Sequence, residues 1–143
     1  MMVNGSTYLG IDDLLKSELK DYELVVRKIH INEFFSKDNM QHVADLQPDI
    51  VWFNTTSRNL MSQDIENFLI NLGNLWKSVA RNFNSIIIQN NFEYCRHSVS
   101  SKKINEINTL IENEGKKVKN FYICNINQVA NNIGMDNWYN DEY

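Results

Sequence analysis

Hydrophobic residues along the chain fall into two kinds of pattern. Some form short, wholly apolar runs, of which Ile50 to Phe53 and Ile86 to Ile88 are the clearest. Such runs between turn signals predict strands, and their lack of polar alternation predicts burial on both faces. Other stretches repeat apolar residues every three or four positions, which predicts amphipathic helices. The expected strands are 1–3, 23–31, 49–54, 85–89 and 118–125, and the expected helices are 9–20, 39–46, 62–82, 101–115 and 127–133.

Helix start and stop signals support these boundaries. Pro48, the only proline, ends the short helix before the central strand. Ser62 is the expected start of the long helix, and Ser100 or Ser101 is the expected cap of the next one. Gly115 follows the last apolar position of that helix and is expected to end it.

Strands and helices alternate throughout, which predicts a mostly parallel sheet with helices on both faces. This arrangement is a three-layer α/β/α sandwich. The 143 residues fit one domain spanning 1–143, and 43% hydrophobic residues are enough for a core. Right-handed crossovers would bring the carboxyl ends of the strands to one rim, where ligands bind in such sheets.

Three residues near this rim are candidates for catalysis. Ser6 follows the first strand and is a nucleophile if a base lies near it; otherwise it is a turn or cap residue. Asn59 follows the central strand and is either an oxyanion donor or a loop asparagine that closes a turn. His97, in the loop after the fourth strand, is either a general base or a surface histidine.

Further polar side chains after three of the strands are the expected substrate-binding groups. Arg58 is suited to bidentate binding of a carboxylate or phosphate, although an arginine in a loop is more often a solvated surface residue. The other groups offer amides and a hydroxyl to a ligand. The full expected set is Asn54, Ser57, Arg58, Asn90, Asn125 and Gln128.

Several common signatures are absent from the sequence. There is no dinucleotide-binding glycine motif, no phosphate-binding loop and no nucleophile elbow, and no carboxylate or histidine cluster has metal-ligand spacing. No cofactor and no metal are therefore expected. Cys95 and Cys124 lie far apart, which favours two reduced, partly buried thiols over a disulfide framework.

Charge and hydropathy exclude two classes of partner. The net charge is −4, and no basic stripe runs along the chain, so nucleic-acid binding is not expected. No apolar run approaches the roughly 20 residues of a membrane span. The first residues lack the charged and apolar regions of a secretory signal, so the expected location is the cytoplasm.

Three segments together resemble a known family. They are Asn-Gly-Ser-Thr at 4–7, Gln-Pro-Asp-Ile-Val at 47–51 and Ile-Gly-Met-Asp-Asn-Trp-Tyr-Asn-Asp-Glu-Tyr at 133–143. They resemble the amino-terminal domain of FkbH-like proteins, which precedes a phosphatase-like domain of the haloacid dehalogenase superfamily. The resemblance spans nearly the whole chain, and its closing segment is the most telling.

The resemblance implies a flavodoxin-like fold of the SGNH (GDSL-type) hydrolases. Those enzymes use a serine after the first strand, and Ser6 has that place in this chain. They use a Gly-x-Asn-Asp element after the central strand, and residues 57–59 have that place here, without its glycine. They also use Asp-x-x-His after the last strand, where this chain has Asn125 and Gln128. Neither amide accepts a proton from serine at neutral pH, and a serine without its base loses most of its reactivity.

The resemblance therefore implies a non-catalytic SGNH-like module that binds an acyl group or a protein partner. FkbH-like proteins are implicated in loading a glyceryl unit onto an acyl carrier protein, so that carrier or a haloacid-dehalogenase-type protein or domain is the implied partner. The chain contains no Asp-x-Asp motif, so phosphatase activity is not expected from it. The alternatives are a divergent esterase or acyltransferase using Ser6, Asn59 and His97, and a fragment of a longer protein.

Overall fold

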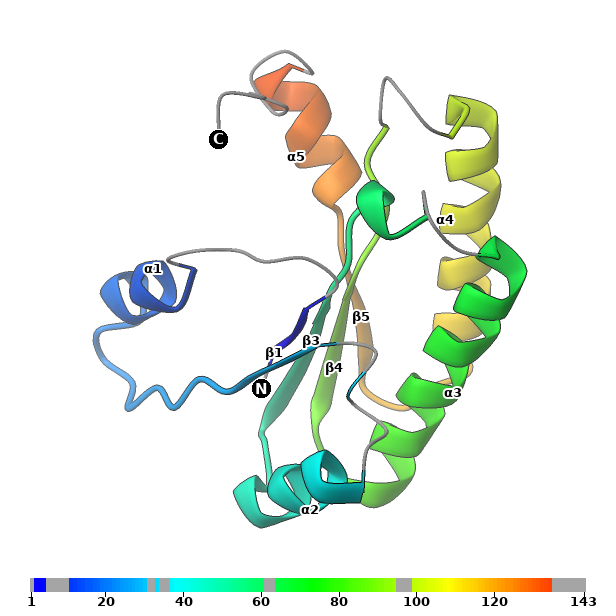
Figure 1. Cartoon of the computed structure of the whole chain (residues 1–143). Helices are drawn as coiled ribbons and strands as arrows, with labels where there is room; N and C mark the ends of the chain where they lie inside the picture. The colour runs from blue at the N-terminus through cyan, green and yellow to red at the C-terminus, as the bar shows by residue number, and fades with distance from the viewer. Residues whose placement is uncertain are drawn as a thin grey trace.

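The computed structural model describes residues 2–4, 11–30, 33, 37–60, 64–94 and 99–134. Within these residues, parallel strands form one sheet in the order β2-β1-β3-β4-β5. The predicted alternation of strands and helices around a parallel sheet is confirmed (Figure 1). The strands are β1 (Met2–Asn4), β2 (Lys28–His30), β3 (Ile50–Asn54), β4 (Ile86–Asn90) and β5 (Phe121–Cys124). The helices are α1 (Ile11–Glu18), α2 (Lys37–Leu46), η2 (Ser57–Leu60, a 3-10 helix), α3 (Ile65–Asn82), α4 (Ser101–Gly115) and α5 (Ile126–Ile133).

Side-chain caps set the beginnings of the last three helices. Asp64, not Ser62, is the N-cap of α3, because its carboxylate accepts hydrogen bonds from two backbone N–H groups of the first turn. Ser100 caps α4 as predicted, and Asn125 caps α5. Gly134 stops α5 with a φ of 88°, which glycine adopts without strain. None of the described helices is long and apolar enough to cross a membrane.

The second strand is shorter than the sequence predicts. Apolar residues predicted a strand over 23–31, but among the described residues of this range Lys28–His30 joins the sheet and residues 23–27 lie outside it. In the sheet, Lys28–His30 pairs in register with Met2–Asn4 of β1. Residues 24–26 have a β-rich composition, so pairing between distant segments overrides local β propensity there.

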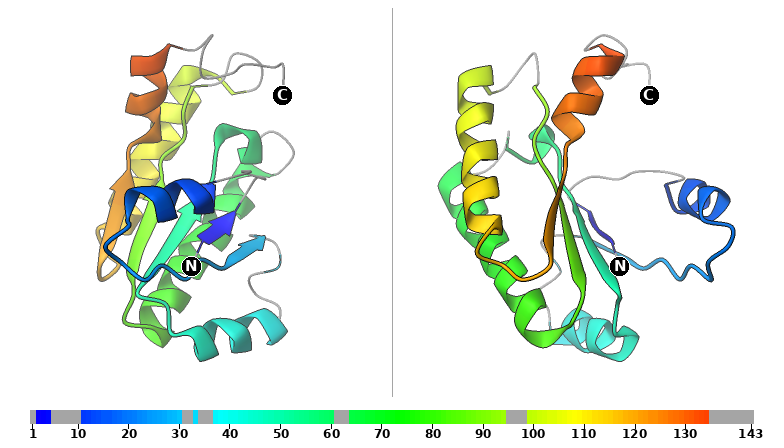
Figure 2. Two further views of the ribbon diagram at one scale, coloured as in Figure 1. Left: turned by 90° about the vertical axis from the view of Figure 1, so that its left-hand side faces the viewer. Right: turned by 180° about the vertical axis from the view of Figure 1, so that it is seen from behind.

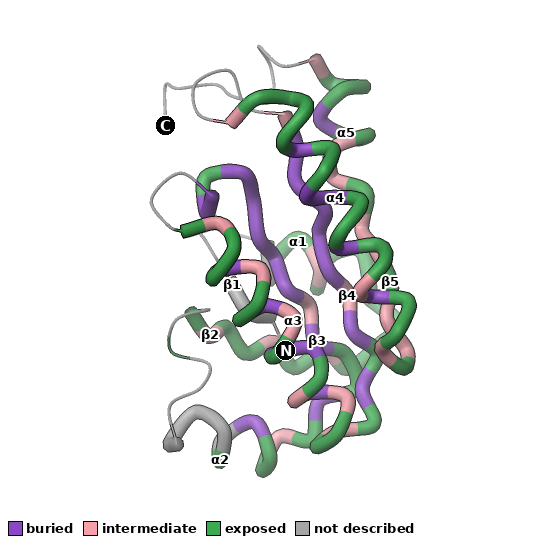
Figure 3. Tube along the Cα trace, turned by 90° about the vertical axis from the view of Figure 1, so that its right-hand side faces the viewer, coloured by how far each residue is buried: buried purple, intermediate pink, exposed green. Residues whose placement is uncertain are grey.

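One face of the sheet carries the hydrophobic core. Helices α3 and α4 lie side by side over this face (Figures 1 and 3), and the residues of β3 and β4 beneath them are fully buried. Trp76 of α3 packs edge-on against Phe121 of β5, with 4.8 Å between ring centroids. Other core residues, contributed by strands, helices and loops, include Val51, Phe53, Leu72, Val79, Ile87, Phe92, Ile104 and Ile111.

The opposite face is much more open, so the predicted burial of the central strands on both faces is wrong. Ile50 and Ile86 are 43% and 41% exposed, and Tyr122 is 60% exposed. Helix α1 lies on this side of the sheet (Figure 2). Its own Leu14 is 58% exposed, so α1 does not bury its apolar side against the sheet.

Candidate functional site

Polar side chains gather at the carboxyl ends of β3, β4 and β5, a region we call the polar edge and define as residues 54–59, 89–94 and 125–128. Because the strands are parallel, these segments meet at one edge of the sheet, as predicted. Buried polar groups are costly unless they are hydrogen-bonded, so this concentration needs internal partners. The buried polar residues of the polar edge are Asn54, Thr55, Thr56, Ser57, Asn59, Gln89, Asn90, Asn91 and Glu93.

Two of the predicted binding residues form a ladder with a tryptophan on the open face of the sheet. The indole Nε1 of Trp52 donates to Oδ1 of Asn90 over 2.7 Å. Nδ2 of Asn90 then donates to Oδ1 of Asn54, also over 2.7 Å. The structure therefore brings Asn54 and Asn90 together, and their buried amides bond to each other.

Gln89 makes a second ladder on the core side, and the sequence reasoning did not single it out. Nε1 of Trp76 donates to Oε1 of Gln89 over 3.0 Å. Nε2 of Gln89 donates to Oγ1 of Thr55 over 2.7 Å and to the backbone carbonyl of Asn90 over 2.7 Å. This side chain ties α3 to the loop after β3. The signal in the sequence that could have identified Gln89 is its position as a polar residue directly after the apolar run Ile86 to Ile88.

Ser57 and Glu93 join the loops after β3 and β4 through a buried carboxylate. The backbone N–H of Ser57 donates to both carboxylate oxygens, over 3.3 and 3.2 Å, and its hydroxyl donates to Oε1 over 2.9 Å. Glu93 is 1% exposed and Ser57 is fully buried. The hydroxyl of Ser57 therefore fastens η2 to the loop after β4, with no surface open to a substrate. The sequence reasoning missed Glu93, whose only signal was one carboxylate between Phe92 and Tyr94.

Asn59 acts as a turn-closing residue. Its Oδ1 accepts from the backbone N–H of Thr56 over 2.9 Å, and its own N–H donates to the Thr56 carbonyl over 2.9 Å. The turn-closing role that the sequence allowed is thus present, and the role of its Nδ2 as an oxyanion donor stays a prediction. The hydroxyl of Thr56 is buried and has no hydrogen-bond partner within the described part of the chain.

Asn125 and Gln128 build the start of α5. Oδ1 of Asn125 accepts from the backbone N–H of Gln128 over 3.1 Å and from Nδ2 of Asn91 over 2.8 Å. Nδ2 of Asn125 donates to Oε1 of Gln128 over 3.3 Å. Both residues are exposed, so they are open to a ligand while Asn125 caps the helix.

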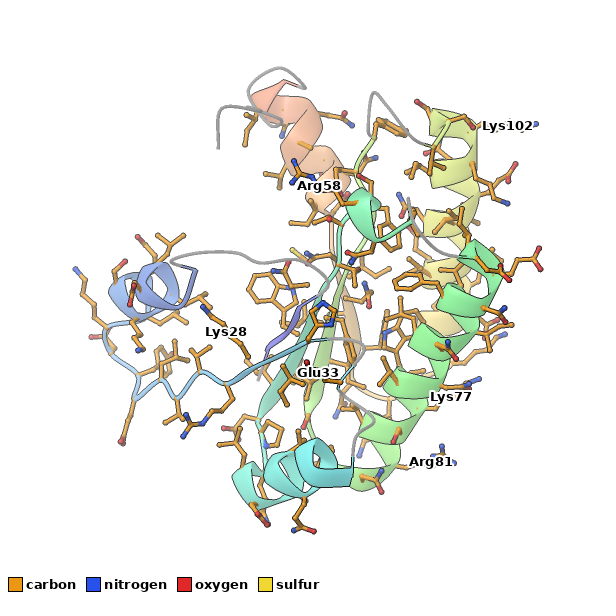
Figure 4. All side chains as sticks on the ribbon, in the orientation of Figure 1. Lys28, Glu33, Arg58, Lys77, Arg81 and Lys102 are labelled. Atoms are coloured by element: carbon orange, nitrogen blue, oxygen red, sulfur yellow. The ribbon has the colours of Figure 1, made fainter. Side chains whose placement is uncertain are left out.

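Arg58 is the exposed residue between the buried Ser57 and Asn59. Its side chain points away from α3 and α4 (Figure 4). Ser6 and His97 lie outside the described residues, so their grouping with Asn59 stays a prediction. Cys95 also lies outside them, whereas Cys124 is a free, half-buried thiol whose pKa is raised by burial.

The described residues show no group of three or more histidine, cysteine or acidic side chains that could hold a metal ion. They form two grooves that contain no residue of the polar edge. One, of about 470 Å³, lies at the amino ends of β3 and β4, opposite the end where ligands bind in parallel sheets. The other, of about 260 Å³, lies between α3 and α4.

Comparisons with protein-family models, curated proteins and solved structures found no match to this chain. Inferences about function therefore depend on the chemistry of the polar edge.

Proposed function

We propose that this chain is a non-catalytic SGNH-like module that binds an acyl group, or the carrier protein bearing it, at the polar edge. One observation carries the proposal. By the resemblance to SGNH hydrolases, Asn125 and Gln128 take the place of the acid–base pair, and in the structure Asn125 caps α5 while its Nδ2 donates to Oε1 of Gln128. An amide does not accept a proton from a serine hydroxyl at neutral pH, so these positions supply no general base.

The buried part of the polar edge is occupied by its own hydrogen bonds. Ser57 is fully buried and its hydroxyl already donates to Glu93. Its neighbour Asn59 directs Oδ1 to the backbone of Thr56. These contacts hold the buried groups in place, so that they form a rigid scaffold for the exposed residues of the polar edge.

The exposed groups of the edge suit the arm of a carrier protein. Arg58 offers a planar guanidinium, which binds phosphate with two parallel hydrogen bonds. Asn125 and Gln128 each offer an amide that both donates and accepts. A phosphopantetheine arm presents a phosphate, backbone-like amides and an acyl thioester, which match these groups in chemistry.

We expect Arg58→Ala to weaken binding of acetyl-phosphopantetheine about tenfold or more, because charged hydrogen bonds to its phosphate are lost. Titration of the ¹⁵N-labelled protein, followed by amide chemical shifts, measures this affinity. Lys102→Ala is the matched control, because Lys102 is an exposed cation on α4 that is not part of the polar edge (Figure 4). Equal affinities for wild type, Arg58→Ala and Lys102→Ala would contradict the proposed site.

The alternative, a divergent esterase or acyltransferase using Ser6, Asn59 and His97, makes the opposite prediction for turnover. The binding module should hydrolyse neither p-nitrophenyl acetate nor acetyl-phosphopantetheine above the buffer rate. Robust hydrolysis that disappears in Ser6→Ala and in His97→Ala would overturn the non-catalytic proposal in favour of the enzyme.

We further propose that the sheet belongs to a flavodoxin-like, three-layer sandwich. The strand order β2-β1-β3-β4-β5 is the order of that doubly wound fold. A right-handed β1-α1-β2 crossover assigns α1 to the face opposite α3 and α4. That face exposes Ile50 and Ile86, and α1 exposes Leu14, so closure of α1 on the sheet would bury apolar surface on both.

If α1 closes on the sheet, Leu14→Asp should lower the free energy of unfolding by about 2 kcal/mol, because a charge would replace a side chain that closure buries. Lys16→Asp is the control, since Lys16 is a charged, exposed residue of the same helix and should change stability by less than about 0.5 kcal/mol. Urea unfolding followed by tryptophan fluorescence compares the two variants. Equally small effects would count against the third layer.

A further inference from the structure

The groove between α3 and α4 is an apolar feature separate from the polar edge. It holds about 260 Å³. Ile70 of α3 and Leu110 of α4 line it and are 60% and 52% exposed, while Leu69 and Ile111 line it from more buried positions. Figure 3 shows the two helices running side by side on this surface. Large apolar side chains exposed together along a groove are typical of interaction sites.

Gly73 of α3 leaves this groove open. Glycine in the middle of a helix costs about 1 kcal/mol relative to alanine. Its backbone lies within the regular helix, and a Cβ at this position would meet no atom within 4 Å. Neither backbone conformation nor packing within the described residues therefore requires glycine here. Its effect is to leave space that an incoming side chain can occupy.

Basic residues gather where the groove reaches the carboxyl ends of α3 and α4. Nε of Arg81 donates to the backbone carbonyl of Lys77 over 3.1 Å, which holds both cations on one stretch of α3 (Figure 4). Nζ of Lys119 donates to Oδ1 of Asn84 over 3.3 Å, so the segment after α4 meets the segment after α3. We call this the basic end and define it as Lys77, Arg81, Lys116, Lys117 and Lys119.

Acidic side chains only partly offset the charge of the basic end. Glu114 lines the groove and forms an ion pair with Lys117 over 2.5 Å. The hydrogen bond from Lys117 lowers the pKa of Glu114, and the positive charge of Lys77 acts in the same direction. Glu114 is thus an anion at neutral pH. Even so, the five cations of the basic end contrast with the chain's net charge of −4.

We propose that the groove between α3 and α4 docks an acidic amphipathic helix of a partner protein. Apolar side chains spaced three or four residues apart would enter the groove over Gly73, between Ile70 and Leu110. Carboxylates beside them would meet Lys77 and Arg81. Charge complementarity selects this partner, because an apolar helix with a basic face would be repelled by the basic end. The site contains no residue of the polar edge and does not depend on the function proposed there.

A fluorescein-labelled helical peptide with leucines at helical spacing and glutamates between them tests this proposal. The acidic peptide should bind saturably, and more weakly as salt rises. A second peptide with lysine in place of every glutamate should not bind. Gly73→Leu fills the groove and Lys77→Glu reverses a charge, so each should weaken binding at least about tenfold.

Matched variants separate groove blocking from general damage. Gly73→Ala leaves the groove open, and Lys102→Glu reverses a charge at the opposite end of α4, so each should keep affinity within about twofold of wild type. Three results would each overturn the proposal. The first is that the acidic peptide does not saturate the protein by about 1 mM. The second is that the lysine peptide binds as tightly as the acidic peptide, and the third is that both Gly73→Leu and Lys77→Glu keep wild-type affinity. Binding of phosphatidylglycerol vesicles but not the peptide would assign the groove to membranes instead.

Discussion

Glu93→Leu is expected to lower the free energy of unfolding by about 3 kcal/mol or more, the largest effect among these predictions. Glu93 is buried and accepts hydrogen bonds from both the backbone N–H and the hydroxyl of Ser57. Leucine accepts neither, so two buried donors would lose this acceptor. Urea or guanidinium unfolding, followed by tryptophan fluorescence, measures the change.

The control for Glu93→Leu is the same substitution at an exposed glutamate. Glu112 is exposed on α4, so Glu112→Leu should change stability by less than about 0.5 kcal/mol. Ser57→Ala removes only the hydroxyl and should cost about 1 kcal/mol. The double variant then gives the coupling between the two side chains. If Glu93→Leu were as mild as Glu112→Leu, the carboxylate would not be fastening η2 to the loop after β4.

Gly115→Ala is expected to destabilise the protein by about 1–3 kcal/mol through overpacking. A Cβ at Gly115 would overlap the ring of Phe121. That ring cannot swing away freely, because it packs edge-on against the buried Trp76 with 4.8 Å between centroids. The expected result is a lower unfolding midpoint with an unchanged denaturant slope.

The same substitution at Gly73 should act in the opposite direction. Gly73 also lies in a helix, but an added Cβ there meets nothing within 4 Å. Alanine favours the helix over glycine by about 1 kcal/mol, so Gly73→Ala should raise stability by about 0.5–1 kcal/mol. A stabilising effect at both glycines would show that Phe121 does not confine Gly115.

Gly115 also illustrates the limit of local sequence signals. The pattern predicted that α4 ends there, and α4 does end at Gly115. The usual reason, a left-handed glycine after the helix, does not apply, because the cap residue Lys116 has φ −57° and ψ −21°. The physical demand for glycine comes from Phe121, which the chain reversal after α4 brings against it.

At the polar edge, sequence reasoning located the loops but not their contacts. The positions of Asn54, Ser57 and Asn90 at strand ends followed from the parallel sheet. Their partners did not, because Asn54 and Asn90 lie 36 residues apart and Ser57 and Glu93 also lie 36 residues apart. Only the β3–β4 register and the path of both loops bring such groups within hydrogen-bond distance.

The sequence by itself determined the order of strands and helices and the polar character of the loops after the strands. Hydrophobic periodicity carries that information, because it reflects how each segment alternates between buried and exposed positions. The tertiary structure decided which face α3 and α4 cover, how short β2 is, and which polar groups are occupied internally. Those outcomes depend on packing and pairing between distant segments. The Asp49 to Leu60 stretch, for example, reads as a strand and a loop, yet Glu93 and Asn90 determine which of its polar groups remain exposed.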